Sequence, residues 1–181
     1  MSAGDCGAVG AQSGGGATLG TLIEQYTAGA WTIVPSPGPS DSDGSWLNAL
    51  TCVDASDCWA VGHDAADQEP LIEQYSDGTW SIVAGPRPPT EGNNTLTGVT
   101  CPSAGECWAV GGDNMTGDPQ GFIEQYSGSG WSLVSSPDSS GGSALDGVAC
   151  VSPQECWAVG ASGIEGDPSH ALIEQYSQPS S

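Results

Sequence analysis

Leu22-Ile23-Glu24-Gln25-Tyr26 is the stretch that decides the fold, because the same five-residue word returns along the chain. It recurs at Leu71 to Tyr75 and at Leu172 to Tyr176, and a variant that starts with Phe122 lies between them. Successive copies start at positions 22, 71, 122 and 172, which are 49, 51 and 50 residues apart. Repeats with a period of about 20 to 50 residues are typical of solenoids, propellers and other arrays. The sequence therefore predicts one structural unit repeated about four times.

A second repeated word, Cys-Trp-Ala-Val-Gly, marks another strand of the same unit. It starts at Cys58, Cys107 and Cys156, and a degraded copy, Cys-Gly-Ala-Val-Gly, starts at Cys6. A Leu-containing stretch precedes this word, and a Trp-x-Ile-Val or Trp-x-Leu-Val stretch follows the glutamate word. Short apolar runs bounded by Gly, Asp and Ser indicate β-strands. The 28 Gly and 13 Pro of the chain disfavour helices.

Four strands in about 49 residues match the size of a β-propeller blade. We therefore predict an all-β fold of about four propeller-type blades, each built from four antiparallel strands called a to d in chain order. The predicted blades span residues 1–46, 47–95, 96–144 and 145–181. The first lacks strand a and the last lacks strand d, so we expect an open arc or part of a larger ring rather than a self-closed monomer.

Three features together resemble a kelch-type blade: a Gly that closes strand b, a Tyr on strand c and a Trp five residues later. The Tyr and Trp pairs are Tyr26/Trp31, Tyr75/Trp80 and Tyr126/Trp131. The whole chain also resembles secreted bacterial proteins built from tandem Cys-Trp-Ala-Val-Gly and Leu-Ile-Glu repeats. The resemblance implies the propeller fold and leaves the function open. These repeats depart from kelch blades in carrying cysteine pairs and in lacking the Arg and His positions with which many kelch domains grip protein partners.

The charge of the chain excludes several partner classes. Arg87 is the one basic residue against 22 acidic ones, and the formal net charge is −21. Nucleic acid binding depends on Lys and Arg that neutralise phosphates, so we predict no nucleic acid partner. Anionic membrane surfaces are disfavoured for the same reason, and no run of 18 apolar residues predicts membrane insertion. Because mild acid relieves the self-repulsion, we expect greater stability or self-association near pH 4 to 5 than at pH 8.

The cysteines predict an oxidising compartment. Six of the seven form Cys-x5-Cys pairs, in which a hairpin disulfide fits better than two buried free thiols; the pairs are Cys52/Cys58, Cys101/Cys107 and Cys150/Cys156. Cys6 is the odd thiol, expected to be unpaired or to form an intermolecular bridge. We therefore predict an exported, extracellular or cell-surface protein, although no signal peptide is recognisable in this stretch of sequence.

Repeated polar and aromatic residues have structural and functional interpretations. The glutamates Glu24, Glu73, Glu124 and Glu174 are expected to make repeated structural hydrogen bonds, with their Gln neighbours. Paired carboxylate catalysis is disfavoured because equivalent positions of different blades lie far apart. The Trp residues of strands b and d are expected to form the core between blades, and stacking on sugars is the alternative.

Candidate binding residues lie in the variable loops that strand order places at one face. They are Trp46, Asp64, Asp67, Asp113, Asp118 and Asp167. We expect no cofactor; if this acidic face holds a cation, Ca²⁺ is the expected one, with Asp41 and Asp43, or Asp113 and Asn114, as its ligands. The competing interpretation is a solvated acidic rim.

The function that these observations favour is a non-enzymatic, secreted or cell-surface propeller module that binds a glycan or a protein. The alternative is a structural subunit that self-assembles through exposed blade faces into rings or filaments, or that completes a larger propeller. A glycan-active enzyme domain ranks last, because one Arg, no Lys and two His leave few electrophilic groups.

Overall fold

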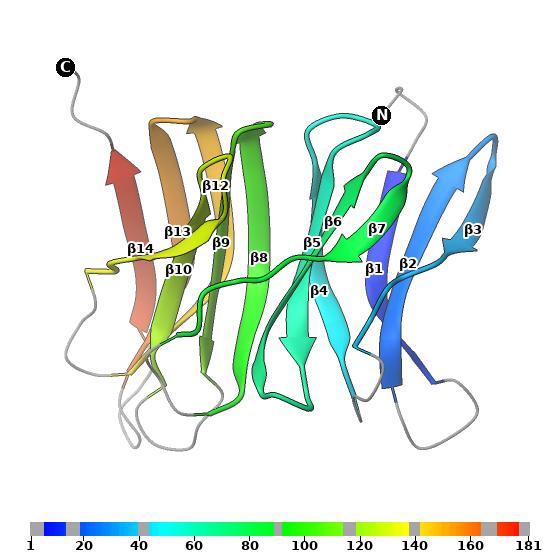
Figure 1. Cartoon of the computed structure of the whole chain (residues 1–181). Coiled ribbons are helices and arrows are strands. Elements are labelled where there is room, and N and C mark those ends of the chain that lie inside the picture. The colour runs from blue at the N-terminus through cyan, green and yellow to red at the C-terminus, as the bar shows by residue number, and fades with distance from the viewer. Residues whose placement is uncertain are drawn as a thin grey trace.

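The computed structural model describes residues 6–13, 19–39, 44–88, 92–113, 119–137, 142–163 and 170–177. Within these ranges the chain forms fourteen β-strands in four antiparallel sheets that pack side by side (Figure 1). The predicted all-β fold class is confirmed. No helix long and apolar enough to cross a membrane occurs in this part of the chain.

The strands follow the repeat. The first sheet contains β1 (Cys6–Ser13), β2 (Leu19–Thr27) and β3 (Ala30–Val34). The second sheet contains β4 (Trp46–Cys52), β5 (Cys58–Asp64), β6 (Glu69–Ser76) and β7 (Thr79–Ile82). The third sheet contains β8 (Asn94–Ser103), β9 (Glu106–Asp113), β10 (Gly121–Tyr126) and β11 (Trp131–Val134). The fourth sheet contains β12 (Ser143–Ser152), β13 (Glu155–Ser162) and β14 (His170–Ser177).

The strand register is the same in every sheet. The cysteine near the start of the second strand of a repeat lies opposite the tyrosine of the glutamate word, in the pairs Cys6 and Tyr26, Cys58 and Tyr75, Cys107 and Tyr126, and Cys156 and Tyr176. Side chains alternate between the two faces of a strand, so a common register assigns each repeat position to one face of its sheet. Residues at equivalent positions can therefore be compared directly between junctions.

The glycine of the Cys-Trp-Ala-Val-Gly word is required by close backbone packing. A Cβ on Gly62 would lie 1.9 Å from the carbonyl oxygen of Trp46, a separation that no side chain tolerates. The first two strands shift register beside this point, between Leu47 and Ala49. The third and fourth sheets repeat both features, with Cβ clashes of 1.9 Å at Gly111 and 2.0 Å at Gly160. A bulge that brings two backbones together thus explains the repeated Gly.

Each complete cysteine pair forms a disulfide that ties the first two strands of its repeat. The bridges join Cys52 to Cys58, Cys101 to Cys107 and Cys150 to Cys156, as the sequence predicts. Cys6 is free and exposed. Three disulfides in one small chain indicate an oxidising environment.

Replacing Cys101 and Cys107 together with alanine is expected to lower the free energy of unfolding by about 2 kcal/mol, because the bridge restricts a short loop of the unfolded chain. Urea denaturation of the oxidised proteins measures the change. Cys6→Ala is the control, because it removes an exposed thiol without breaking a bridge. A double variant as stable as this control would contradict the prediction.

Candidate functional site

The junctions between sheets are built from equivalent aromatic side chains. At the junction of the second and third sheets, the fully buried Trp59 contacts two aromatic rings. Its ring centroid lies 4.7 Å from that of Tyr126 and 5.3 Å from that of Trp131, the latter in an edge-to-face arrangement. At the next junction Trp108 lies 4.4 Å from Tyr176. A tryptophan on the second strand of one sheet thus packs against aromatic residues of the following sheet.

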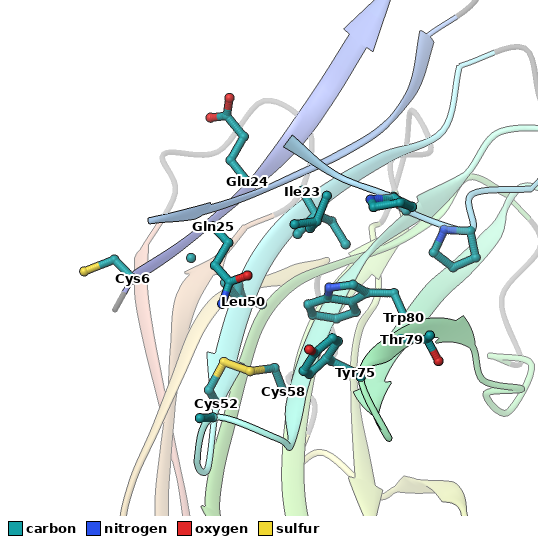
Figure 2. Close-up of a pocket in the computed structure, with 17 residues that line it drawn as sticks. Cys6, Ile23, Glu24, Gln25, Leu50, Cys52, Cys58, Tyr75, Thr79 and Trp80 are labelled. Carbon is teal, nitrogen blue, oxygen red and sulfur yellow. A yellow bond between two sulfur atoms is a disulfide. The ribbon is translucent and has the colours of Figure 1, made fainter. Parts of the chain in front are cut away.

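The first junction lacks this tryptophan. Gly7 of β1 occupies the position of Trp59 and Trp108, while Tyr75 and Trp80 retain the positions of the aromatic residues opposite. A cavity of about 380 Å³ lies there, between the first and second sheets. In Figure 2, Ile23, Tyr75 and Trp80 line its interior, whereas the thiol of Cys6 and the carboxylate of Glu24 point away from it.

The outer faces of the first and fourth sheets expose the same kinds of residues that the junctions bury. Trp31 is 50% exposed and lies 5.4 Å from Tyr26, which matches the 5.7 Å between Tyr126 and Trp131. We name the first surface, formed by Tyr26, Trp31 and Ile33, the N-terminal end face.

The opposite surface is the C-terminal end face, formed by Trp157, Val159 and Ile173, all exposed. Their counterparts in the second sheet, Trp59, Val61 and Ile72, are fully buried. The prediction that the repeated tryptophans form core is therefore wrong for Trp31 and Trp157, because no described residue covers the face on which each lies.

Three of the repeated glutamates, Glu73, Glu124 and Glu174, are buried between sheets, and two of these have a serine partner, whereas Glu24 is half-buried on the outer face of the first sheet. The hydroxyl of Ser36 lies 3.0 and 3.1 Å from the two carboxylate oxygens of Glu73 and donates to them. Ser136 donates to Glu174 at 2.8 Å. Each serine follows the last strand of the preceding sheet, so this hydrogen bond crosses the junction. For these two residues the predicted structural role is confirmed.

Glu124 is the exception in this row. It is fully buried, and neither carboxylate oxygen has a hydrogen-bond partner among the described residues. The position of Ser36 and Ser136 is taken by Gly85, on which a Cβ would lie 3.5 Å from Oε2 of Glu124. The expected hydrogen bond at Glu124 is therefore wrong. The signal was present in the aligned sequence, where Val34-Pro-Ser and Val134-Ser-Ser correspond to Val83-Ala-Gly.

Burial changes the acidity of these carboxyls. It raises the pKa of Glu124 to about 8, and the negative charge of Glu69 adds to the shift. Burial also raises the pKa of Glu73 to about 7, although the hydrogen bond from Ser36 opposes the effect. A carboxylate without donors pays the full cost of leaving water, so Glu124 is held in its neutral form at neutral pH.

The glutamines beside these glutamates make a second repeated contact. Each donates from its side-chain amide to the carboxylate of the residue that directly precedes the cysteine of the second strand of its repeat. The pairs are Gln74 with Asp57 at 3.4 Å, Gln125 with Glu106 at 3.3 Å and Gln175 with Glu155 at 3.5 Å. These contacts join the second and third strands of a sheet and agree with the expected structural role.

Two aspartates predicted to bind ligand hold their own loops together. The carboxylate of Asp64 accepts hydrogen bonds from the Ser45 hydroxyl at 3.2 Å and from the backbone N–H of Ala66 at 3.1 Å. Asp113, at the equivalent place in the third sheet, is buried and accepts from the N–H of Gln120 at 3.1 Å. The accepting oxygen of Asp64 shapes the turn after β5, and that of Asp113 joins the end of β9 to Gln120, just before β10.

Of the remaining predicted aspartates, Asp67 lies within the described residues. Asp67 is exposed on the loop before β6. Asp41, Asp43, Asn114, Asp118 and Asp167 lie outside the described residues. Within the described ranges, no group of three or more His, Cys, Asp or Glu side chains is placed to hold a metal ion.

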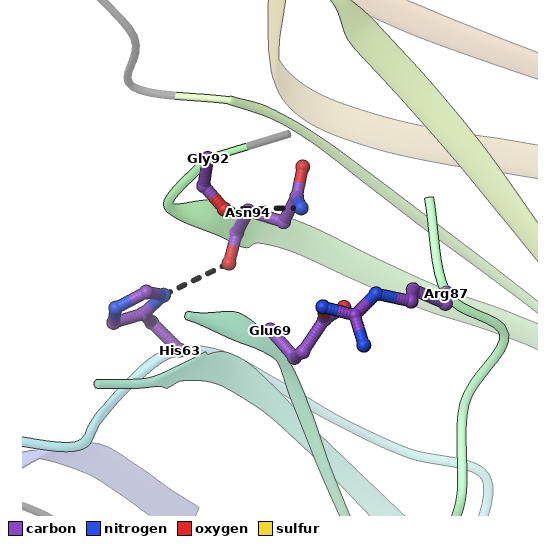
Figure 3. Close-up of polar contacts among 5 residues, drawn as sticks. All are labelled: His63, Glu69, Arg87, Gly92 and Asn94. Atoms are coloured by element: carbon purple, nitrogen blue, oxygen red, sulfur yellow. Dashed lines mark hydrogen bonds and ion pairs between the residues drawn. The ribbon is translucent and has the colours of Figure 1, made fainter. Parts of the chain in front are cut away.

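Trp46 packs on a buried histidine. Its ring lies 4.5 Å from that of His63, whose Nδ1 donates to the carbonyl oxygen of Asn94 at 2.8 Å (Figure 3). Nearby, Arg87 forms an ion pair with Glu69 at 2.6 Å. Trp46 therefore belongs to a contact that connects the second sheet to the start of the third, rather than to a loop.

No known protein family matches the sequence, and neither does any curated protein. Two glycines depart from the repeat: Gly7 leaves a cavity, and Gly85 leaves the carboxyl of Glu124 without a donor among the described residues. The two end faces carry the same repeat positions as the internal junctions.

Proposed function

We propose that this chain is a non-enzymatic, exported propeller-type module that binds protein, and that its partner is a second copy of itself docked head to tail. The observation that carries the proposal is the pair of Tyr26 and Trp31. Their ring geometry, 5.4 Å and 52°, matches the 5.7 Å and 46° of Tyr126 and Trp131, the pair that receives Trp59 at an internal junction.

The opposite end face supplies the matching residue. Trp157 occupies the position of Trp59 on its own sheet and is 39% exposed. Docking the C-terminal end face of one copy on the N-terminal end face of the next would place Trp157 beside Tyr26 and Trp31. Aromatic pairs of this kind contribute about 0.5 to 1.5 kcal/mol beyond the apolar area they bury. Such head-to-tail contacts generate rings when they close and filaments when they do not.

Charge opposes this association at neutral pH. Each copy carries a formal charge of −21, so two copies repel one another before their apolar faces meet. Salt screens such repulsion, and mild acid removes part of the charge. The association is therefore expected to strengthen as the ionic strength rises and as the pH falls from 8 to 5.

Two observations support a non-enzymatic role. Glu73 and Glu124 are fully buried, so neither carboxyl can reach a substrate at the surface. The sequence also has one Arg and no Lys with which to stabilise a developing negative charge. A glycan that stacks on Trp31 or Trp157 is the competing occupant of the same end faces.

Sedimentation velocity over a range of protein concentrations, at pH 5 and pH 8, tests the proposal. The mass of the wild type is expected to rise with concentration, and Trp157→Gln is expected to weaken association at least about tenfold, since one lost aromatic contact of roughly 1.4 kcal/mol suffices. Ile82→Gln is the matched control, because Ile82 is an exposed apolar residue of an internal sheet.

Two results would contradict head-to-tail docking. The first is a wild type that stays monomeric at every concentration and both pH values. The second is a Trp157→Gln variant that associates as strongly as Ile82→Gln. A monomer whose tryptophan fluorescence changes on a glycan panel would assign the end faces to sugars instead.

A further inference from the structure

We propose that the cavity at the first junction is a binding site for a small planar aromatic molecule of the size of indole. The proposal rests on what fills the equivalent space elsewhere. At the two later junctions this place holds the indole ring of Trp59 or Trp108, both buried. At the first junction the chain supplies Gly7, and the space remains open.

Two aromatic side chains still line the cavity, although the tryptophan that packs on their counterparts at the later junctions is missing. Tyr75 and Trp80 lie 5.5 Å apart at 47°, close to the 5.7 Å and 46° of Tyr126 and Trp131. The latter pair holds the indole of Trp59. An aromatic ring entering beside Tyr75 and Trp80 would meet the same two surfaces, in tilted or edge-to-face contact.

The remaining walls select an uncharged ligand. Ile23, Val34, Pro35 and Leu50 contribute apolar surface, and no lining residue carries a positive charge that could receive an anion. A cation would lose its hydration in an apolar slot, without a carboxylate aimed at it, since that of Glu24 points away (Figure 2). The volume of about 380 Å³ lies within the range of about 300 to 1,000 Å³ typical of small-molecule sites.

Leu50, which faces Gly7, is larger than its counterparts in the later repeats and fills only part of the cavity. Leu50 occupies the position of Val99 and Val148 in the later repeats. Its Cδ2 reaches to 2.4 Å from where a Cβ on Gly7 would stand, so the larger side chain extends over the glycine. One additional methylene replaces little of an indole ring, and the volume that remains is the proposed site.

Isothermal titration of the 181-residue chain with indole tests the proposal. We expect submillimolar binding and a melting temperature that rises with indole concentration, because a ligand of the folded state stabilises it. Cyclohexanol, a saturated ring with no aromatic face, is expected to bind at least about tenfold more weakly, a difference equivalent to one aromatic contact. Equal affinity for the two compounds would overturn the aromatic specificity.

The first variant fills the cavity with a tryptophan side chain of the protein itself. Gly7→Trp combined with Leu50→Val recreates the pair found at the later junctions and is expected to abolish indole binding while raising the melting temperature. The Leu50 change is needed because the new side chain would otherwise collide with Leu50. Retained indole affinity in the folded double variant would overturn the proposal.

Removing one wall provides a second variant that does not depend on the first. Trp80→Leu is expected to weaken indole binding at least about tenfold, because it removes one of the two aromatic contacts. Trp31→Leu is the matched control: Trp31 holds the same repeat position in the first sheet but lies on the outer face. Equal loss in both variants, or no indole binding by the wild type, would overturn the site.

Discussion

Glu124→Gln is expected to raise the free energy of unfolding at pH 8 by a few kcal/mol, and to flatten its dependence on pH between about 5 and 8. The reason is the buried carboxyl, which has no hydrogen-bond partner in the part of the chain that the structure describes and whose pKa in the folded protein is raised from 4.5 to about 8. Glutamine has nearly the same shape and carries no charge at any pH. It therefore keeps the packing and removes the titration.

The stability falls as the pH rises, because the folded protein binds a proton that the unfolded chain has lost. Between pH 4.5 and about 8, the carboxyl is ionised in the unfolded chain and protonated in the folded one. Each unit of pH in this window lowers the stability by up to about 1.4 kcal/mol. The stability associated with the neutral carboxyl is complete below pH 4.5 and is lost as the pH rises towards 8. Glu73 contributes in the same direction up to about pH 7.

Urea unfolding at unit steps from pH 5 to pH 8 measures the effect. Asp67→Asn is the control, because it removes one negative charge from an exposed loop of the neighbouring sheet. Both substitutions remove one carboxyl from the unfolded chain, but Asp67→Asn removes a solvent-exposed carboxyl from the folded protein and Glu124→Gln a buried one, so a difference between their pH profiles isolates the effect of burial. Parallel profiles for Glu124→Gln and Asp67→Asn would show that general charge repulsion causes the pH dependence.

Gly85→Ser is expected to stabilise the protein at pH 8 by about 1.5 to 3 kcal/mol, the range for a hydrogen bond to a charged group. The serine would stand where Ser36 and Ser136 donate to Glu73 and Glu174. Its Cβ would lie 3.5 Å from Oε2 of Glu124, which brings a hydroxyl within reach of the carboxylate. The pKa of Glu124 should fall, because a donor favours the ionised form.

Gly85→Ala separates the hydroxyl from the added carbon. Both substitutions bring a Cβ to 3.0 Å from Cδ1 of Ile72, at the flexible end of that side chain. Only serine adds a hydrogen-bond donor, so the Gly85→Ser protein should be more stable than the Gly85→Ala protein at pH 8. The difference between the two should be smaller at pH 5. In the Glu124→Gln background the difference at pH 8 should largely disappear. If alanine stabilises as much as serine, backbone restriction rather than the hydrogen bond is the cause.

Much of the local architecture was predictable because it repeats. The Cys-Trp-Ala-Val-Gly and Leu-Ile-Glu-Gln-Tyr words correspond to β5 and β6 and to their counterparts in the other sheets. The three Cys-x5-Cys pairs form the predicted bridges. Strand alternation and hairpin distance are local properties, which neighbouring residues in the sequence determine.

The candidate site was less predictable, since it depends on contacts between residues far apart in the chain. Alignment of the repeats shows that Gly7 and Gly85 stand where other repeats have a larger residue. The alignment alone does not show which residues of the neighbouring sheet that larger side chain contacts. Trp46 and Asp64 show the converse, because both were predicted to face a ligand. Trp46 instead packs on His63 of its own sheet, and Asp64 accepts a hydrogen bond from Ser45, which directly precedes that sheet's first strand.

The amino-acid sequence by itself determined the repeat, the all-β class, the strand order within each unit and the disulfides. Only the tertiary structure decided that Gly7 faces Tyr75 and Trp80 across a cavity, that Gly85 leaves Glu124 without a donor among the described residues, and that none of those residues covers the faces of Trp31 and Trp157. The physical reason is the difference in range. A strand needs a periodic pattern of near neighbours, whereas burial and hydrogen bonding depend on which face of one sheet meets which face of the next.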